Sequence, residues 1–337
     1  MDRILVVNVN WLGDVVFSLP IFKALKTAYP NAMIACLAVP RVKEVLESNL
    51  YIDHIVVYDE EASDRSLLGK IKLIGRLRRL QFDVAFLLHR SFTRALLIFL
   101  AGIPQRVGYD TKNRGFLLTH RVNPLPEGRH RWEVYRHVLE SYGIRVNGHP
   151  AQLQVDSRAE EEVGRLLEKE GIRPDDFLVV VNAGGNWDLK RWPQEHFSEL
   201  INRLMNELNA RVIMPGALKD RELVHGIVGA SQVRPLIWAG QTSLKQLMAL
   251  LKKAHLVISA DSGPLHLAAG LGTPVIGLFG PTRWEITGPR PQGPAIVIQK
   301  DVGCNREPCY YLSCPDNVCM KSITVDEVMD AVRQLRG

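Results

Sequence analysis

The chain alternates short apolar runs with longer amphipathic stretches, and this alternation limits the folds open to it. Each run is rich in Val, Ile and Leu, which is typical of strands buried on both faces of a parallel sheet. The predicted strands cover residues 4–7, 33–37, 55–58, 84–88, 178–182, 212–214, 235–238, 256–259 and 275–279. The predicted helices cover residues 17–29, 67–80, 196–209, 220–228 and 244–253. Strands that alternate with helices indicate an α/β protein.

The length and the order of these elements favour two doubly wound units over one extended sheet. The chain has 337 residues, and a domain usually holds about 100–200. The strand–helix series restarts after residue 174, and a polar helical stretch at 159–170 lies before it. We therefore place the first domain at residues 1–155 and the second at 156–320.

The positive charge of the chain is confined to its first half. Residues 1–150 carry 21 basic and 14 acidic side chains, whereas residues 151–337 carry 21 and 22. This asymmetry predicts an anionic partner for the first domain, such as a phosphorylated lipid, a nucleic acid or an acidic sugar. The longest strongly apolar run, residues 95–103, is far shorter than the roughly 18 residues of a membrane span. With no signal-peptide pattern after Met1, we expect a cytoplasmic protein.

Ligands of open α/β sheets bind beyond the carboxyl ends of the strands, and three loops there are distinctive. The loop after the first strand, residues 8–14, contains Gly13, which permits a tight turn, and Asp14, which opens the next helix. Asp14 is either a helix N-cap that contributes about 1 kcal/mol or a general base. Position alone favours the cap.

The other two loops suit an anion. Residues 182–186 are small apart from two Asn, so backbone N–H groups can approach a phosphate, with Lys190 supplying a positive charge. The alternative is a plain glycine turn with a solvated Lys–Arg pair. Ser262 and Gly263 open a helix whose N-terminus suits a phosphate. His266, one turn further, either packs in the core or reaches that phosphate.

Missing motifs and the cysteines narrow the chemistry. No Gly-x-Gly-x-x-Gly follows the first strand and no P-loop is present, which disfavours nicotinamide, flavin and P-loop ATPase sites. No Asp-x-Asp pair marks a divalent-metal site. Cys304, Cys309, Cys314 and Cys319 recur every five residues, but zinc ligand pairs more often have two intervening residues. A structural zinc site is one interpretation, and we assign it no catalytic role.

Several motifs follow one another along nearly the whole chain. They are residues 10–14, 91–93, 100–104, 190–193, 217–220, 239–242 and 261–263, with His266. Together these motifs resemble glycosyltransferase family 9, the ADP-heptose:lipopolysaccharide heptosyltransferases, and they are most similar to the branch that adds the second heptose. The family implies a GT-B fold, in which two Rossmann-like domains face a cleft and a final helix within residues 321–337 returns to the first domain. It also implies inversion at the anomeric carbon by single displacement.

The resemblance assigns roles to individual residues. Asp14 becomes the base, while Lys190 and the helix N-terminus at Ser262 offset the charge of the departing ADP without a metal or other cofactor. Asp220 or Glu222 holds sugar hydroxyls of the donor. The donor-binding residues are Asn10, Gly13, Gly184, Lys190, Asp220, Asp261, Ser262, Gly263 and His266. The acceptor-binding residues are Arg90, Arg94, Arg106 and Arg114, of which we expect at least half to be solvated surface residues instead.

The same resemblance implies the partners. The donor is ADP-heptose, and the acceptor is the anionic heptosyl-Kdo2-lipid A inner core of lipopolysaccharide. We expect a monomer, peripheral on the cytoplasmic face of the inner membrane, with no nucleic-acid partner. Leu67, Ile71, Ile74 and Leu77 share a helical face flanked by Lys70, Lys72, Arg76 and Arg79, which either packs on the core or rests on anionic lipid.

Three alternatives stay open. The first is a family member with another acceptor or another nucleotide-sugar donor. The second is a nucleotide-sugar 2-epimerase with a GT-B fold, which needs no second substrate. The third is a non-catalytic protein that binds a nucleotide-sugar.

Overall fold

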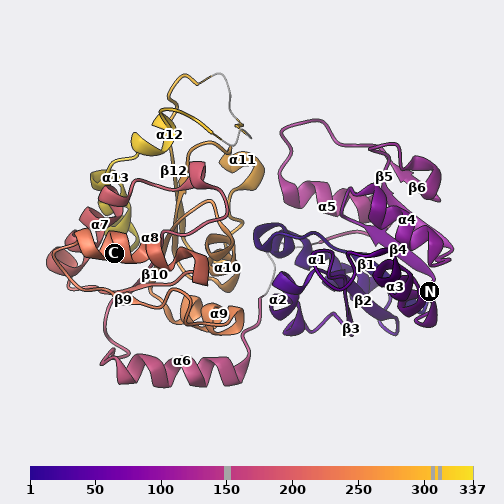
Figure 1. The fold of residues 1–337 in the computed structure, drawn as a ribbon, viewed down its shortest axis with the longest axis horizontal. Coiled ribbons are helices and arrows are strands. Elements are labelled where there is room, and N and C mark those ends of the chain that lie inside the picture. Colours follow the sequence, from indigo (N-terminus) through magenta and orange to yellow (C-terminus); the bar gives the residue numbers. More distant parts are fainter. Residues whose placement is uncertain (148–152, 305–307, 310–312, 337) are drawn as a thin grey trace. The chain divides into compact units, whose positions relative to one another are not determined.

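The computed structural model describes residues 1–147, 153–304, 308–309 and 313–336. It divides into two compact units, Met1–Gln152 and Leu153–Gly337, where we placed the boundary at residue 155. Each unit contains a six-stranded sheet with helices around it (Figure 1). The predicted class, α/β with two Rossmann-like units, is confirmed.

The first unit has a fully parallel sheet in the order β3-β2-β1-β4-β5-β6. Its strands are β1 (Arg3–Val7), β2 (Met33–Ala38), β3 (His54–Val57), β4 (Val84–Leu87), β5 (Gln105–Tyr109) and β6 (His120–Val122). Its helices are α1 (Leu12–Ala28), α2 (Lys43–Glu47), α3 (Leu67–Arg79), α4 (Phe92–Leu100) and α5 (Arg131–Glu140), with short 3-10 turns η1 (Pro40–Val42) and η2 (Gly115–Leu117).

The second unit repeats this design in the order β12-β11-β10-β7-β8-β9, also fully parallel. Its strands are β7 (Leu178–Asn182), β8 (Arg211–Met214), β9 (Leu236–Ile237), β10 (Leu256–Ala260), β11 (Val275–Phe279) and β12 (Ala295–Gln299). Its longer helices are α6 (Ser157–Lys169), α7 (Gln194–Leu208), α8 (Arg221–Ala230), α9 (Leu244–Lys253), α10 (Gly263–Leu271) and α13 (Val325–Arg336). Shorter ones are η3 (Asp188–Lys190), η4 (Leu218–Asp220), α11 (Trp284–Thr287) and α12 (Val318–Lys321).

Both sheets therefore reverse their strand order at one point. The reversal lies between β1 and β4 in the first sheet and between β7 and β10 in the second. At such a switch point the connections on the two sides run to opposite faces, which leaves a crevice at the carboxyl edge where ligands bind. The loops singled out in the sequence follow β1, β7 and β10, so they lie at these two switch points.

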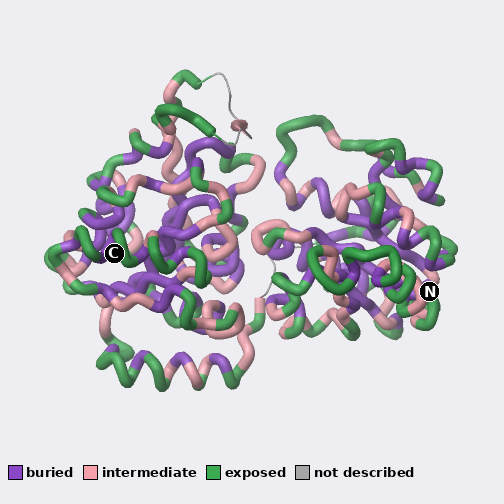
Figure 2. Tube along the Cα trace, in the orientation of Figure 1, coloured by how far each residue is buried: buried purple, intermediate pink, exposed green. Residues whose placement is uncertain are grey.

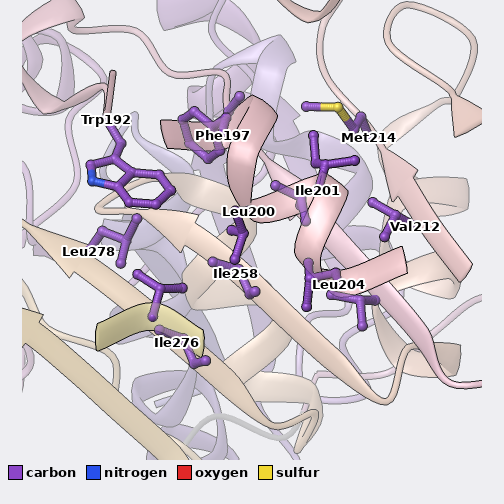
Figure 3. Close-up of a cluster of buried hydrophobic side chains, with 14 of the residues drawn as sticks. Trp192, Phe197, Leu200, Ile201, Leu204, Val212, Met214, Ile258, Ile276 and Leu278 are labelled. Carbon is purple, nitrogen blue, oxygen red and sulfur yellow. The ribbon is translucent and has the colours of Figure 1, made fainter. Parts of the chain in front are cut away.

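The expected return of the last helix to the first domain was wrong. The buried side chains of α13 belong to the core cluster of the second unit, and the helix packs on α7, β11 and β12. Figure 3 shows part of that core, in which Leu200 of α7 lies beside Ile258 of the sheet. Trp192 anchors its edge by donating from Nε1 to the carbonyl of Ile323 at 2.9 Å. The family resemblance implied this helix correctly but assigned its apolar face to the other unit.

Three strands, β5, β6 and β12, were not predicted, although β12 contains the apolar run Ala295–Ile298. β5 opens with Gln105 and Arg106, and β6 is only three residues long and contains His120 and Arg121. β12 lies at an edge of its sheet, and all of its residues are only half-buried. Polar residues in β5 and the short length of β6 explain why these two strands were missed, whereas the apolar run of β12 was an available signal.

Replacing Val328 by Asp is expected to destabilise the second unit by at least about 3 kcal/mol, because it leaves an unpaired carboxylate in the core. Urea denaturation would measure the free energy of unfolding. The matched control is Gln334→Asp, which introduces the same residue at an exposed position of the same helix. Equal stability of the two variants would contradict the packing described for α13.

Candidate functional site

Asn182 joins the two loops at the switch point of the second sheet. It is the last residue of β7 and pairs in register with Ser259 of β10. Its Nδ2 donates to Ser259 Oγ at 3.0 Å, to Ser262 Oγ at 3.1 Å and to the carbonyl of Gly184 at 3.2 Å. The two serine hydroxyls lie 2.8 Å apart. Strand pairing therefore fixes the loop after β7 against the start of α10.

Asp261 is the charged centre of this site. Its side chain is almost fully buried, and Lys190 Nζ lies 2.6 Å from its Oδ2. The hydroxyl of Thr282 donates to the same oxygen at 2.7 Å, and that of Thr287 at 3.2 Å. His266 Nε2 lies 3.2 Å from Oδ1. One carboxylate thus fixes groups from η3, α10 and the segment that follows β11.

These partners keep Asp261 ionised. Burial would raise the pKa of a carboxyl group, but the hydrogen bond with His266 and the charge of Lys190 lower the pKa of Asp261 well below its usual range. The carboxylate in turn orients the ammonium of Lys190, which also lies 5.5 Å from the Trp187 ring centroid. The site therefore holds a partly exposed cation in a fixed position.

The N-terminus of α10 lies next to that cation. Ser262 is the N-cap residue in an extended conformation, and its side chain makes no capping hydrogen bond to the helix. Its hydroxyl instead meets Asn182 and Ser259. The first turn of a helix has N–H groups without intrahelical partners and a partial positive charge, which together attract an anion. The site can thus bind a phosphate between Lys190 and the start of α10.

Asp220 and Gly184 pack against each other in the same unit. A Cβ at position 184 would lie 2.7 Å from Cγ of Asp220, so only glycine leaves room for the carboxylate. Oδ2 of Asp220 accepts a hydrogen bond from the backbone of Ala217 at 3.0 Å. Its buried Oδ1 has no hydrogen-bond partner, although Arg191 Nη2 lies 3.9 Å away. This oxygen is an acceptor still to be satisfied.

In the first unit, Asp14 does not serve as a helix cap. α1 begins at Leu12 with Trp11 as its N-cap residue, so Asp14 lies within the first turn beside Gly13. Its Oδ1 accepts a hydrogen bond from Tyr135 Oη at 2.6 Å. Burial, together with the charge of Asp14, raises the pKa of Tyr135 well above its usual value. Tyr135 therefore stays a hydrogen-bond donor and holds one carboxylate oxygen of a half-buried Asp14.

Asn10 is held by a second pair of residues. Its Nδ2 donates to Glu60 Oε1 at 2.8 Å, and the other oxygen of Glu60 pairs with Arg94 Nη2 at 3.2 Å. Arg94 is buried and also donates to the backbone carbonyl of Asn8 at 2.9 Å. A buried arginine thus ties the loop after β1 to the start of α4.

The arginines named as acceptor contacts differ from the solvated surface residues we expected. Arg114 is fully buried and donates to the carbonyls of Tyr109 and His89 at 2.9 and 2.6 Å. Arg106 donates to the carbonyls of Leu117 and Ile103, both at 2.6 Å. These two guanidinium groups fix backbone, and Arg94 fixes the Asn10 loop. Arg90 is half-buried, and its guanidinium lies 4.6 Å from the Tyr109 ring centroid.

The residues that position the predicted ones were not among the expected site residues. Tyr135 lies 121 positions from Asp14, and no local pattern links them. Thr282 and Thr287 follow β11, the strand next to β10, and both donate to Asp261. The small-residue turn at 280–282 was the available signal for this segment. Glu60 carried no signal, because an acidic residue in a loop is usually solvated.

The cysteines form no site within the part of the chain that the structure describes. Cys304, Cys309, Cys314 and Cys319 take part in no disulfide among the described residues. Among the described residues, no three His, Cys, Asp or Glu side chains come together as a metal site. The described helices also include none with the length and apolarity needed to cross a membrane.

Comparisons with known proteins agree with this architecture. A family model described as glycosyltransferase family 9 (heptosyltransferase) matches residues 70–311. Lipopolysaccharide heptosyltransferase 2 of Salmonella typhimurium is 30% identical over 302 residues, which cover 85% of each chain. The structure of Escherichia coli ADP-heptose lipopolysaccharide heptosyltransferase II has a TM-score of 0.81 at 24% identity, covering 99% of this chain and 98% of that one. A family 9 glycosyltransferase of Veillonella parvula gives a TM-score of 0.87 at 24% identity, covering 99% and 97%.

His89 gives the first unit a pH dependence that can be measured. Burial and the nearby charges of Arg94, Arg114 and Lys112 lower its pKa from about 6.5 to about 4. An unfolded His89 would bind a proton below about pH 6.5, so the free energy of unfolding should fall as the pH drops from about 6.5 to 4. Urea denaturation across this range should show a weaker pH dependence for His89→Asn than for the wild type.

The control is His54→Asn at an exposed position of the same unit, which should retain the dependence of the wild type. An unchanged pH profile for His89→Asn would show that His89 is not the group responsible.

Proposed function

The chain belongs to glycosyltransferase family 9, and from that membership we propose that it transfers a heptose from ADP-heptose to the inner core of lipopolysaccharide. The observation that carries the proposal is the cation and helix N-terminus that meet at the second switch point. There, Lys190 is held by Asp261 beside the start of α10. The relative named lipopolysaccharide heptosyltransferase 2 favours a heptosyl-Kdo2-lipid A acceptor, to which this chain adds the second heptose.

The donor binds at the second unit in this proposal. Lys190 and the first turn of α10, opened by Ser262 and Gly263, hold the diphosphate of ADP-heptose. His266 supports the same contact through Asp261. Oδ1 of Asp220 accepts a hydrogen bond donated by a hydroxyl of the donor's ribose or heptose, with Gly184 leaving the room that the carboxylate needs.

The chemistry is a single displacement that inverts the anomeric carbon. Asp14 takes the proton from the acceptor hydroxyl as that oxygen bonds to the anomeric carbon of the heptose. The bond from that carbon to the diphosphate oxygen breaks, and ADP leaves with the electron pair. Lys190 and the N-terminus of α10 offset the negative charge that gathers on the diphosphate. Tyr135 keeps the Asp14 carboxylate in place through its 2.6 Å hydrogen bond.

The first unit binds the acceptor in this account, because its excess of basic residues suits a phosphorylated, acidic glycolipid. Arg90 is the proposed contact among the four arginines, since the other three are engaged with backbone carbonyls or with Glu60. Asn10 and Gly13 position the turn that carries Asp14. We further propose that the protein acts as a monomer on the cytoplasmic face of the membrane that holds this acceptor.

One assay separates this function from its alternatives. Purified protein is incubated with ADP-heptose and lipid A–Kdo acceptors that carry no heptose or one heptose, and the products are read by mass spectrometry. The proposal expects one added heptose on the acceptor that already has one. Addition only to the heptose-free acceptor would reassign the step, and conversion of the donor without any acceptor would favour a 2-epimerase. Binding without turnover would favour a non-catalytic protein.

Asp14→Asn is expected to lower the transfer rate by about 10²–10⁴-fold, the usual contribution of a general base, while ADP binding stays unchanged. Initial rates and calorimetric titration with ADP would measure the two effects. Asp2→Asn, which alters a fully exposed carboxylate of the same unit, should match the wild type in both. Near-normal transfer by Asp14→Asn would rule out Asp14 as the base.

Lys190→Ala is expected to weaken ADP binding by about tenfold to a hundredfold, since it removes a charge-assisted contact to the diphosphate. Isothermal titration calorimetry measures the dissociation constant, and thermal unfolding verifies that the variant is folded. Lys169→Ala on the exposed side of α6 is the control. A folded Lys190→Ala protein with wild-type affinity for ADP would place the diphosphate elsewhere.

A further inference from the structure

The first unit exposes large apolar side chains on two helices and a turn. Leu67, Leu68 and Ile71 of α3 are 74%, 71% and 54% exposed. Phe92 of α4 is 39% exposed, and Phe116 of η2 is 67% exposed. We call these five residues the apolar edge surface. The two interpretations of the face formed by Leu67, Ile71, Ile74 and Leu77 each hold for part of it, because Leu77 packs in the core whereas Leu67 and Ile71 are exposed. In Figure 2 buried residues gather inside the first unit and exposed residues lie over its surface.

The five side chains lie on neighbouring elements at one edge of the sheet. α3 packs on α4, and α4 packs on η2, with the rings of Phe92 and Phe116 6.1 Å apart. Leu67 and Phe92 are the first residues of their helices, and η2 follows the carboxyl end of β5. In a parallel sheet, helix N-termini lie at the carboxyl edge of the strands. Asp14, in the first turn of α1, lies at this same edge.

The surroundings of the apolar edge surface are positively charged. From Arg65 to Phe82 the chain has six basic residues and no acidic one. Arg65 and Lys72 are exposed and Lys70 is half-buried, whereas Arg76 pairs with Asp64 at 3.0 Å. Exposed apolar side chains beside unpaired cations match an anionic membrane surface, because the apolar groups enter the lipid and the cations meet its headgroups.

We propose that the apolar edge surface docks the protein on an anionic lipid bilayer, with Arg65, Lys70 and Lys72 contacting headgroups. The inference rests on the proposed function, because a lipid-linked acceptor must reach Asp14 from a membrane. Docking at the carboxyl edge of the first sheet brings the bilayer to the edge that carries this carboxylate. A polar protein partner would leave the exposed leucines without an apolar contact.

Co-sedimentation with vesicles tests the proposal on the full chain. The vesicles contain phosphatidylcholine alone or phosphatidylcholine mixed with phosphatidylglycerol. One variant combines Leu67→Ser, Leu68→Ser and Ile71→Ser, and a second combines Arg65→Glu, Lys70→Glu and Lys72→Glu. The wild type should bind the anionic vesicles and not the neutral ones. Each triple variant should lose about tenfold or more of the bound fraction, as expected for three surface cations or three lipid-inserted side chains.

The controls make the same changes on the second unit. The apolar control combines Leu166→Ser, Leu218→Ser and Val318→Ser, all at exposed positions, and the charge control combines Arg165→Glu, Lys169→Glu and Arg173→Glu. Both should bind anionic vesicles like the wild type. Equal binding by the edge variants and the controls would overturn the proposal. The proposal would also be overturned if the wild type were a dimer and the edge variants were monomers, since that result would assign the surface to a second copy of the chain.

A second readout separates docking from catalysis. The edge variants should transfer heptose to a deacylated, soluble acceptor at the wild-type rate and to the vesicle-bound acceptor more slowly. If the wild type transfers to neither acceptor, the proposed function fails, while the vesicle experiment still decides whether the surface binds lipid. If the edge variants lose transfer to the soluble acceptor as well, the surface serves the catalytic site and the docking proposal is overturned.

Discussion

The pairing of β7 with β10 is the constraint on which the proposed donor site depends. These two strands lie side by side although β8 and β9 separate them in the sequence, and their register places Asn182 next to Ser259. Because both strands end at the same edge, the loops that follow them must meet there. The amide of Asn182 then bonds to both serines, and the start of α10 is fixed relative to β7.

A buried carboxylate organises the charges at that edge. Asp261 would be costly to bury alone, and its contacts with Lys190, Thr282, Thr287 and His266 compensate for that cost. The same contacts fix the direction of the Lys190 ammonium before any ligand arrives. A cation already in position loses less side-chain entropy when it meets a phosphate. Buried residues also position groups in the first unit. Tyr135 donates a hydrogen bond to Asp14, and Arg94 fixes the loop that carries Asn10 through Asn8 and Glu60.

The sequence predicted what local pattern encodes and missed what distant contacts decide. The central strands are continuous apolar runs, so their positions and the loops after them could be read directly. β5 and β6 have no such run. Arg106 and Arg114 looked like surface cations, yet they bind backbone carbonyls, because only the folded chain brings those carbonyls to them. Tyr135 and α13 illustrate the same limit. The partner of Tyr135, Asp14, lies 121 positions away in the sequence. The apolar face of α13 could pack on either unit, and only the folded chain shows that it packs on the second.

Hydrogen–deuterium exchange of the full chain with and without ADP tests the central claim most directly. If a diphosphate binds where β7 and β10 end, ADP should slow amide exchange in residues 183–190 and 262–267, at the loop after β7 and the first turn of α10. Peptides from α6 and from the first unit's β2 and β3 should exchange at unchanged rates. Unchanged exchange in both loops at a saturating ADP concentration, with protection elsewhere in the chain, would contradict the account.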